Sequence, residues 1–364
     1  MRFPSFLVLF GLLLSACGSG SPPGSTAPTT STPPAAMADA PLDLSERFAL
    51  SASPGCADGY PATIDEARFL TPSGGFPVPY GHFLNSGWGG SAIGWSVGDP
   101  MQAAPDSLEI RWFSYTEDKF YEGHFLLPQE RIYQLLKAGV WDAENQEQVT
   151  YNDLSLSVVP GGVVFVWLAV AGANQVLIGR YAAQEIPYDY ARHRPKVDRA
   201  ADVADTRAKL APEVRREIAT RTISSKKWDA WLERYPWQLA FSQALTLTEY
   251  GIGYLNAEST SYPPTPDTGA YAQVVLAPSP KPVPSRISFH MAGAYGRKKI
   301  FKVRPFDEAE TMGAFQILAA AHPGQPLTLF VEMNEQLTQA SLSLRAGKQV
   351  IPLTKSPVQL FDPN

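Results

Sequence analysis

Ser96 has the setting that comes nearest to a catalytic motif. It is the centre of the segment GWSVG (residues 94–98), which fits the G-x-S-x-G nucleophile elbow, where small residues let a tight strand-to-helix turn expose a serine. A working elbow needs a helix directly after it, but Asp99-Pro100 follows. We therefore interpret this segment as a loop and keep a serine hydrolase using Ser96 as the less favoured alternative.

The other reactive residue types do not form a site either. The five histidines are scattered and none forms a pair with metal-ligand spacing, so no metal site is expected. Glu109 and Glu122 are expected to face each other across a hairpin, as solvated strand carboxylates rather than an acid/base pair. His124, beside Phe125, is interpreted as a core or edge residue. We therefore predict that the protein is not an enzyme and needs no cofactor.

The N-terminus carries the clearest chemical signal. Arg2 precedes the apolar run 6–14, and Ser15-Ala16-Cys17 closes it. This pattern resembles the lipobox of bacterial lipoproteins. The resemblance implies cleavage between Ala16 and Cys17, a diacylglycerol thioether on Cys17 and an acyl chain such as palmitate on the new amine. An ordinary secretory signal and an uncleaved membrane helix are the alternatives, and the helix fails because the run is shorter than the ~20 residues that span a bilayer. No Asp follows Cys17, which in that family favours the outer membrane, facing the periplasm.

Composition bounds the class of protein. The 364 residues are 45 % hydrophobic and 18 % charged, which indicates a globular body. The formal net charge is −5, and loss of Arg2 with the signal peptide leaves 29 basic against 35 acidic residues, or −6, which argues against a nucleic-acid partner. With Cys17 lipidated, Cys56 is the only other cysteine, so no intrachain disulfide is expected. We expect Cys56 to be a buried, inert thiol.

Two segments share one order of predicted elements. The first has strands around 108–112 and 119–127, a helix opened by Pro128 and strands at 163–170 and 175–182. The second has strands at 287–291 and 299–303, a helix after Pro305 and strands at 327–333 and 340–351. The sequence therefore predicts an α+β fold of two β-β-α-β-β units with antiparallel sheets. A divergent internal duplication is one explanation and the chance recurrence of common motifs is the other; different strand orders would rule the duplication out.

Composition also suggests the domain boundaries. Residues 18–40 are rich in Gly, Ser, Pro, Thr and Ala and cannot form a core. Residues 192–234 hold 12 basic against 7 acidic residues. They predict either a helical connector whose tryptophans dock on a domain, or a basic surface for anionic lipids or an acidic partner. The expected division is a signal peptide (1–16), a lipidated cysteine and tether (17–40), an N-terminal α+β domain (41–190), a basic helical connector (191–262) and a C-terminal α+β domain (263–364).

Part of the chain resembles an uncharacterised family of bacterial lipoprotein domains. The resemblance rests on Gly94-Trp95, on LEIRWFS (108–114), EDKFY (117–121) and Leu127-Pro128, and on PGG (160–162) before a strand with Trp167. It spans about 75–190. It implies no catalytic residues. Members of that family tend to be encoded near type VI secretion machinery, and some resemble immunity proteins that block lipase effectors in the periplasm.

Together these features predict a non-enzymatic, outer-membrane-tethered periplasmic lipoprotein that binds and neutralises a type VI secretion lipase effector. Its expected partners are the lipid bilayer, through acylated Cys17, and the secreted effector; a structural or envelope-assembly lipoprotein without a toxin partner is the alternative. Aromatic residues often anchor interfaces. The expected partner-binding residues, for which core positions are the alternative, are Trp88, Trp95, Trp112, Tyr115, Tyr121, Trp228 and Trp231.

Overall fold

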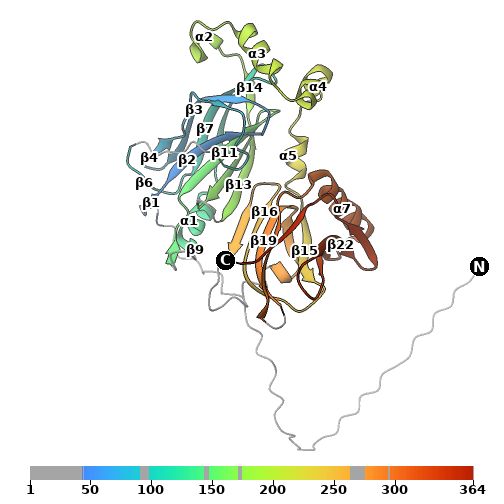
Figure 1. The fold of residues 1–364 in the computed structure, drawn as a ribbon. Helices are drawn as coiled ribbons and strands as arrows, with labels where there is room; N and C mark the ends of the chain where they lie inside the picture. The colour runs from blue at the N-terminus through green and yellow to red at the C-terminus, as the bar shows by residue number, and fades with distance from the viewer. Residues whose placement is uncertain are drawn as a thin grey trace, which may run out of the picture. The chain divides into compact units, whose positions relative to one another are not determined.

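The structure is a computed structural model that describes residues 43, 45–90, 98–142, 147–170, 174–262, 275–293 and 296–363. Several residues named from the sequence lie outside these ranges: the signal peptide, Cys17 and the tether, and also Trp95 and Ser96. Leu42–Asn364 form one compact body. Figure 1 shows its strands and helices, coloured along the chain.

The first part of the chain, 48–186, folds into two β-sheets that pack face to face; we call it the first unit. One sheet has the order β14-β8-β7-β3-β4, and in the other β2 runs parallel to β11, followed by β12 and β13. The buried faces of both sheets and of helix α1 share one hydrophobic core. The elements are β1 (Phe48–Ala49), β2 (Ser51–Cys56), β3 (Ala62–Thr71), β4 (Gly74–Pro77), β5 (Phe83–Leu84), β6 (Met101–Gln102), β7 (Ser107–Ser114), β8 (Lys119–Leu126), α1 (Gln129–Ala138), β9 (Val140–Asp142), β10 (Glu147–Val149), β11 (Asp153–Val159), β12 (Val163–Ala169), β13 (Gln175–Ala182) and β14 (Gln184–Ile186).

The last part, 234–361, also builds two sheets; we call it the second unit. One has the order β24-β20-β19-β16-β17, and in the other β15 runs parallel to β21, followed by β22 and β23, with β18 on the far side of β15. The elements are β15 (Arg234–Phe241), β16 (Thr246–Tyr254), β17 (Ser259–Tyr262), β18 (Ser279–Pro282), β19 (Pro284–Ala292), β20 (Lys298–Val303), α7 (Glu308–Ala321), β21 (Leu327–Met333), β22 (Ala340–Ala346), β23 (Gln349–Pro352) and β24 (Val358–Phe361).

The two units have the same strand order. β14-β8-β7-β3-β4 corresponds to β24-β20-β19-β16-β17, and β2-β11-β12-β13 corresponds to β15-β21-β22-β23. Each long central pair, β3–β7 and β16–β19, also contains a bulge, with Asp65 and Thr248 as the extra residues. The α+β class is as predicted, whereas each unit has more strands than the predicted β-β-α-β-β order and includes one parallel pair. Different strand orders would have ruled out a duplication, and the observed orders agree. The common origin of the two units stays a prediction.

Strand β12 links the two units. Its sequence VVFVWLA is apolar throughout, which is typical of a strand buried on both faces, and all seven residues are buried. Val164, Val166 and Leu168 pack into the core of the first unit. The alternate residues, including Phe165 and Trp167, pack into the core of the second. Successive side chains point to opposite faces of a strand, so β12 contributes to both cores.

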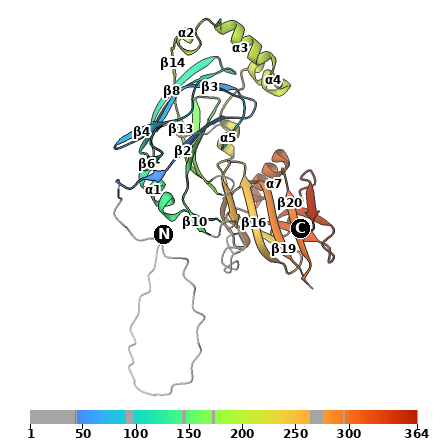
Figure 2. The same ribbon diagram turned by 60° about the vertical axis from the view of Figure 1, so that its left-hand side comes forward.

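The expected division at 190 and 263 is therefore corrected. A single nine-stranded sheet, β2-β11-β12-β13-β17-β16-β19-β20-β24, crosses both boundaries. The first is crossed by the pairing of Gln175 with Ser259 and the second by the long pairing of β16 with β19. The expected helical connector 191–262 is helical only in its first part, which holds α2 (Tyr190–His193), α3 (Arg199–Ala208), α4 (Pro212–Thr220) and α5 (Lys226–Ala230). Its second part supplies β15, β16 and β17, because the alternating apolar residues of 247–254 are buried in the second core. Figure 2 shows α2, α3 and α4 grouped beside β14 and β3.

Candidate functional site

Charged side chains line the outward face of the sheet β14-β8-β7-β3. Alternate residues of β7 point into the first core, so that Glu109 and Arg111 face outward. The antiparallel register with β8 places Glu109 opposite His124 and Arg111 opposite Glu122. All four side chains are at least partly exposed. This face combines acidic and basic groups on a rigid, fully paired strand.

The register corrects one sequence prediction. Glu109 and Glu122 do not face each other, because the turn between Ser114 and Lys119 sets a pairing two residues away from the expected one. Glu109 instead contacts His124, with 3.2 Å between Oε1 and Nδ1. The His124 side chain is 56 % exposed and lies where β8 has no partner strand on one side in the described ranges, so of the predicted core or edge positions it occupies an edge.

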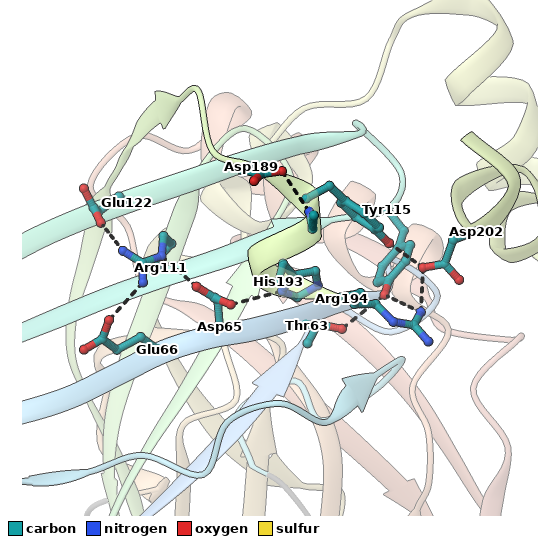
Figure 3. Close-up of polar contacts among 12 residues, drawn as sticks. Thr63, Asp65, Glu66, Arg111, Tyr115, Glu122, Asp189, His193, Arg194 and Asp202 are labelled. Carbon is teal, nitrogen blue, oxygen red and sulfur yellow. Dashed lines mark hydrogen bonds and ion pairs between the residues drawn. The ribbon is translucent and has the colours of Figure 1, made fainter. Parts of the chain in front are cut away.

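Arg111 joins three carboxylates at the centre of this face (Figure 3). Its Nε donates to Asp65 Oδ2 at 2.8 Å, and its Nη2 and Nη1 donate to Glu66 and Glu122, each at 2.9 Å. The guanidinium also lies over the ring of Tyr188, 4.5 Å from its centroid. The β-bulge explains why the neighbours Asp65 and Glu66 both reach one arginine, since an extra residue rotates the side chains that flank it. Arg111 is thus held in one orientation.

A buried carboxylate–imidazole pair lies behind Arg111. Asp65 Oδ1 is 3.2 Å from Nδ1 of His193, which comes from α2, and the side chains are only 13 % and 2 % exposed. The imidazole is surrounded by the rings of Phe113, Phe120 and Tyr190, with centroids 5.7, 5.4 and 5.5 Å away. Among the described residues, its Nε2 has no hydrogen-bond partner. The second ring nitrogen therefore lies in an aromatic cage.

The surroundings fix the charge states of this pair. Burial raises the pKa of the Asp65 carboxyl, but the hydrogen bonds from Arg111 and His193 outweigh it and hold the pKa below its ordinary value. Burial lowers the pKa of His193, and this effect exceeds the opposing effect of Asp65. At neutral pH we therefore assign an ionised carboxylate that accepts the Nδ1 proton of a neutral imidazole.

Helices α2 and α3 cover one end of the same face. Arg199 pairs with Asp118 at 2.7 Å, and Arg207 donates to the backbone carbonyls of Tyr115 and Thr116 at 2.9 and 3.0 Å. Val203 completes the small hydrophobic cluster under these helices. The helical segment is therefore bonded to the hairpin ends of β7 and β8.

The opposite end of the face is an open groove of about 500 Å³. It lies between β8 and the bend where β13 leads into β14. Among the described residues that line it, Arg111 is the only arginine or lysine. Lining residues that matter here are Glu66, Glu109, Glu122, His124, Phe125 and Gln184. The lining carries three carboxylates against one guanidinium, so the groove favours a cationic ligand.

The comparisons with known proteins give a family. Residues 26–225, more than half of the chain, match the family described as a protein of unknown function (DUF2931). The chain belongs to the DUF2931 family. The match extends further than the expected 75–190 and includes the whole first unit and α2 to α4, but not the second unit. No curated protein and no solved structure matches.

In the ranges given above, no cluster of three or more His, Cys, Asp or Glu residues could hold a metal ion. No helix there is long and apolar enough to cross a membrane. The prediction of a buried Cys56 is confirmed: its thiol is free and fully buried, and burial raises its pKa to about 12.

Most of the aromatic residues expected to bind a partner are core residues of the DUF2931 protein. Less than a tenth of each side chain is exposed for Trp112, Tyr115, Tyr121, Trp228 and Trp231. Trp88 is half-buried: its Nε1 donates to the Leu255 carbonyl at 2.8 Å and its ring packs edge-on against Trp231. Large aromatic side chains fill cores as readily as interfaces, which is why composition misplaced them. The docking of Trp228 and Trp231 also agrees with the connector alternative for the basic segment.

The central residues of the site were missed by sequence reasoning. Asp65 and His193 are 128 positions apart, and no spacing rule joins a bulge residue to a short helix at that distance. Arg111 did carry a signal, since it is an outward residue in the period-2 pattern of β7. The contact between Arg111 and Glu122 can be predicted only once the register of β7 with β8 is known.

Proposed function

We propose that this DUF2931 protein is a lipid-anchored periplasmic binding protein, not an enzyme, which neutralises a type VI secretion lipase effector. The observation that supports it best is the charged outward face of β7 and β8, where Arg111 holds Glu66 and Glu122 in fixed positions beside an open groove. Ordered charged groups lose little entropy on binding and select partners by complementary charge.

Two sequence features support the compartment and the partner class. The segment before Cys17 has the lipobox pattern, so the folded body would be held at the outer membrane by several acyl chains, which anchor stably where one does not. The family resemblance adds the link to type VI secretion. A protein held where the effector arrives meets it at high local concentration.

The test is a competition between sibling cells. A strain lacking this gene should lyse when exposed to secretion-competent siblings and survive beside secretion-deficient ones. Complementation with the wild-type chain should restore survival, whereas Cys17→Ala should protect less because the protein is no longer anchored. Ser96→Ala should protect as well as the wild type, since no catalysis is involved.

Full survival of the deletion strain would refute the immunity function. Lysis that occurs equally beside secretion-deficient siblings would also contradict it, and would support the envelope-assembly alternative. The control variant Glu332→Lys changes the charge of a residue that is 65 % exposed on β21 of the second unit, and it should protect as well as the wild type in this competition.

A further inference from the structure

Strand β8 is paired along one edge and only partly along the other. It pairs with β7 over its whole length, 119–126, but with β14 only at Phe120–Glu122. The chain leaves this edge because Ala182, two residues before β14, already pairs with Val163 in the other sheet. Within the described ranges, no strand pairs with Gly123–Leu126 on that side.

In the second unit a strand pairs with the segment that corresponds to this unpaired edge of β8. If the bulges are aligned, Arg111 corresponds to His290, and their partners Glu122 and Ile300 also correspond. Strand β24 pairs with β20 at Ile300–Val303, in antiparallel orientation. The segment Ile300–Val303 is thus equivalent to Glu122–Phe125. In the second unit β24 therefore covers the equivalents of Gly123–Phe125, whereas in the first unit β14 reaches no further than Glu122.

Exposure of the side chains agrees with this comparison. Phe301 and Val303, next to β24, are completely buried. Their equivalents Gly123 and Phe125 are partly exposed, and Leu126 is 79 % exposed. Open edges are normally protected by lysine, proline or a bulge, and the segment GHFL contains no lysine or proline. The edge therefore has the properties of a binding strand.

The groove occupies this open position, and its charge indicates the ligand. Its walls include residues 122–125 of β8 and 182–184 of the bend. Side chains of an added strand that face outward would lie beside Glu122 and the Glu109–His124 pair, and those that face inward would lie beside Phe125. Arg111 already donates to three carboxylates and is not available to neutralise a fourth.

We propose that the Gly123–Leu126 edge of β8 binds an extended segment of a partner protein by antiparallel strand addition, and that this segment alternates Lys or Arg with apolar residues. Main-chain hydrogen bonds would supply affinity and the alternate side chains specificity, as in other cases of strand addition. The inference rests on the proposed function, since it names the part of the partner that the protein binds.

The test uses the full chain in detergent and fluorescent octapeptides measured by anisotropy. An acetylated peptide of alternating Lys and Val should bind. A peptide of alternating Glu and Val should bind at least tenfold more weakly. Two further Lys-Val peptides carry N-methyl groups, one peptide on its Lys amides and the other on its Val amides. The peptide whose methylated amides face β8 should bind at least tenfold more weakly than the unmethylated one. On binding of the first peptide, hydrogen exchange at residues 123–126 should slow.

Variants locate the site. Glu109→Lys should weaken binding of the Lys-Val peptide at least tenfold, whereas the control Glu332→Lys should leave it unchanged. Equal binding of both N-methylated peptides, equal binding of the Glu-Val peptide, or slowed exchange only outside 123–126 would each overturn the proposal. No binding of any peptide would overturn it too. The sibling competition remains a separate result: lysis of the deletion strain without peptide binding leaves the immunity function standing and removes only the strand addition.

Discussion

The two units share one topology and one bulge position but carry different chemistry there. In the first unit the bulge residue Asp65 bonds to Arg111 and to the buried His193. In the second unit the bulge residue is Thr248, whose hydroxyl donates to the His290 carbonyl at 3.5 Å. The backbone thus supplies the same geometry twice, and side-chain types decide whether it holds an ionic network.

The partners of the bulges differ in burial as well. His290 contacts Glu249 at 3.2 Å, with side chains 36 % and 44 % exposed, at the position that Arg111 and Glu66 occupy in the first unit. Exposed pairs of this kind contribute little to stability, whereas a buried charge without its partner is costly. The comparison therefore predicts unequal effects of equivalent substitutions.

The largest difference is expected at the bulge itself. Asp65→Ala should lower the free energy of unfolding by about 3 kcal/mol, because it leaves the buried Nδ1–H of His193 and the Nε–H of Arg111 without an acceptor. Thr248→Ala removes one long, neutral hydrogen bond and should cost less than about 1 kcal/mol. Urea unfolding followed by tryptophan fluorescence measures both. Equal losses would show that the two bulges are energetically alike.

A smaller effect is expected from pH. Burial lowers the pKa of His193 below its ordinary value of 6.5, so the unfolded chain binds this proton more readily than the folded one. Stability should therefore fall as the pH drops below about 6.5, by at most about 1.4 kcal/mol per pH unit for one proton. Asp65 does not contribute in this range, since its stabilisation is lost only below its ordinary pKa of 3.8.

The His193→Phe variant isolates this contribution. Its unfolding free energy, measured between pH 7 and 5, should depend less steeply on pH than that of the wild type. Phenylalanine fits the aromatic cage and cannot take up a proton. Parallel curves for the two proteins would contradict a buried neutral His193.

The smallest effects are expected at the exposed glutamates. Glu66→Gln weakens the ion pair with Arg111 and Glu249→Gln the contact with His290; these carboxylates are 63 % and 44 % exposed, and each substitution should cost less than about 1 kcal/mol. The losses should shrink further in 1 M salt, which screens exposed charges. A much larger loss for Glu66→Gln would show that the whole network of the first unit, and not its buried part alone, sets the difference between the units.

Local patterns in the sequence predicted many elements correctly. The alternation of Leu108, Ile110 and Trp112 marks β7, Pro128 stands just before α1, and 175–182 and 327–333 are strands with the predicted bounds. These elements are determined by neighbouring residues, through strand period and helix capping. The predicted strand 340–351 is two strands, because the turn at Gly347 divides it.

Contacts between distant parts of the chain were not predictable in the same way. The parallel pairing of β2 with β11 joins residues about a hundred positions apart, and composition placed β15 and β16 in a helical connector. The site depends on such contacts: Asp65 comes from a bulge and His193 from α2, and the next helix, α3, is bonded to the β7–β8 turn by Arg199. A single sequence carries no signal for these juxtapositions.

The double burial of β12 has a consequence for the family as a whole. The DUF2931 match ends at 225, but a protein cut there would expose the face of β12 formed by Val163, Phe165 and Trp167. A shorter relative that consists of the first unit alone must therefore carry polar residues at these three positions, or cover them by pairing with another chain. In this chain, the apolar residues on that face of β12 match its burial in the second core.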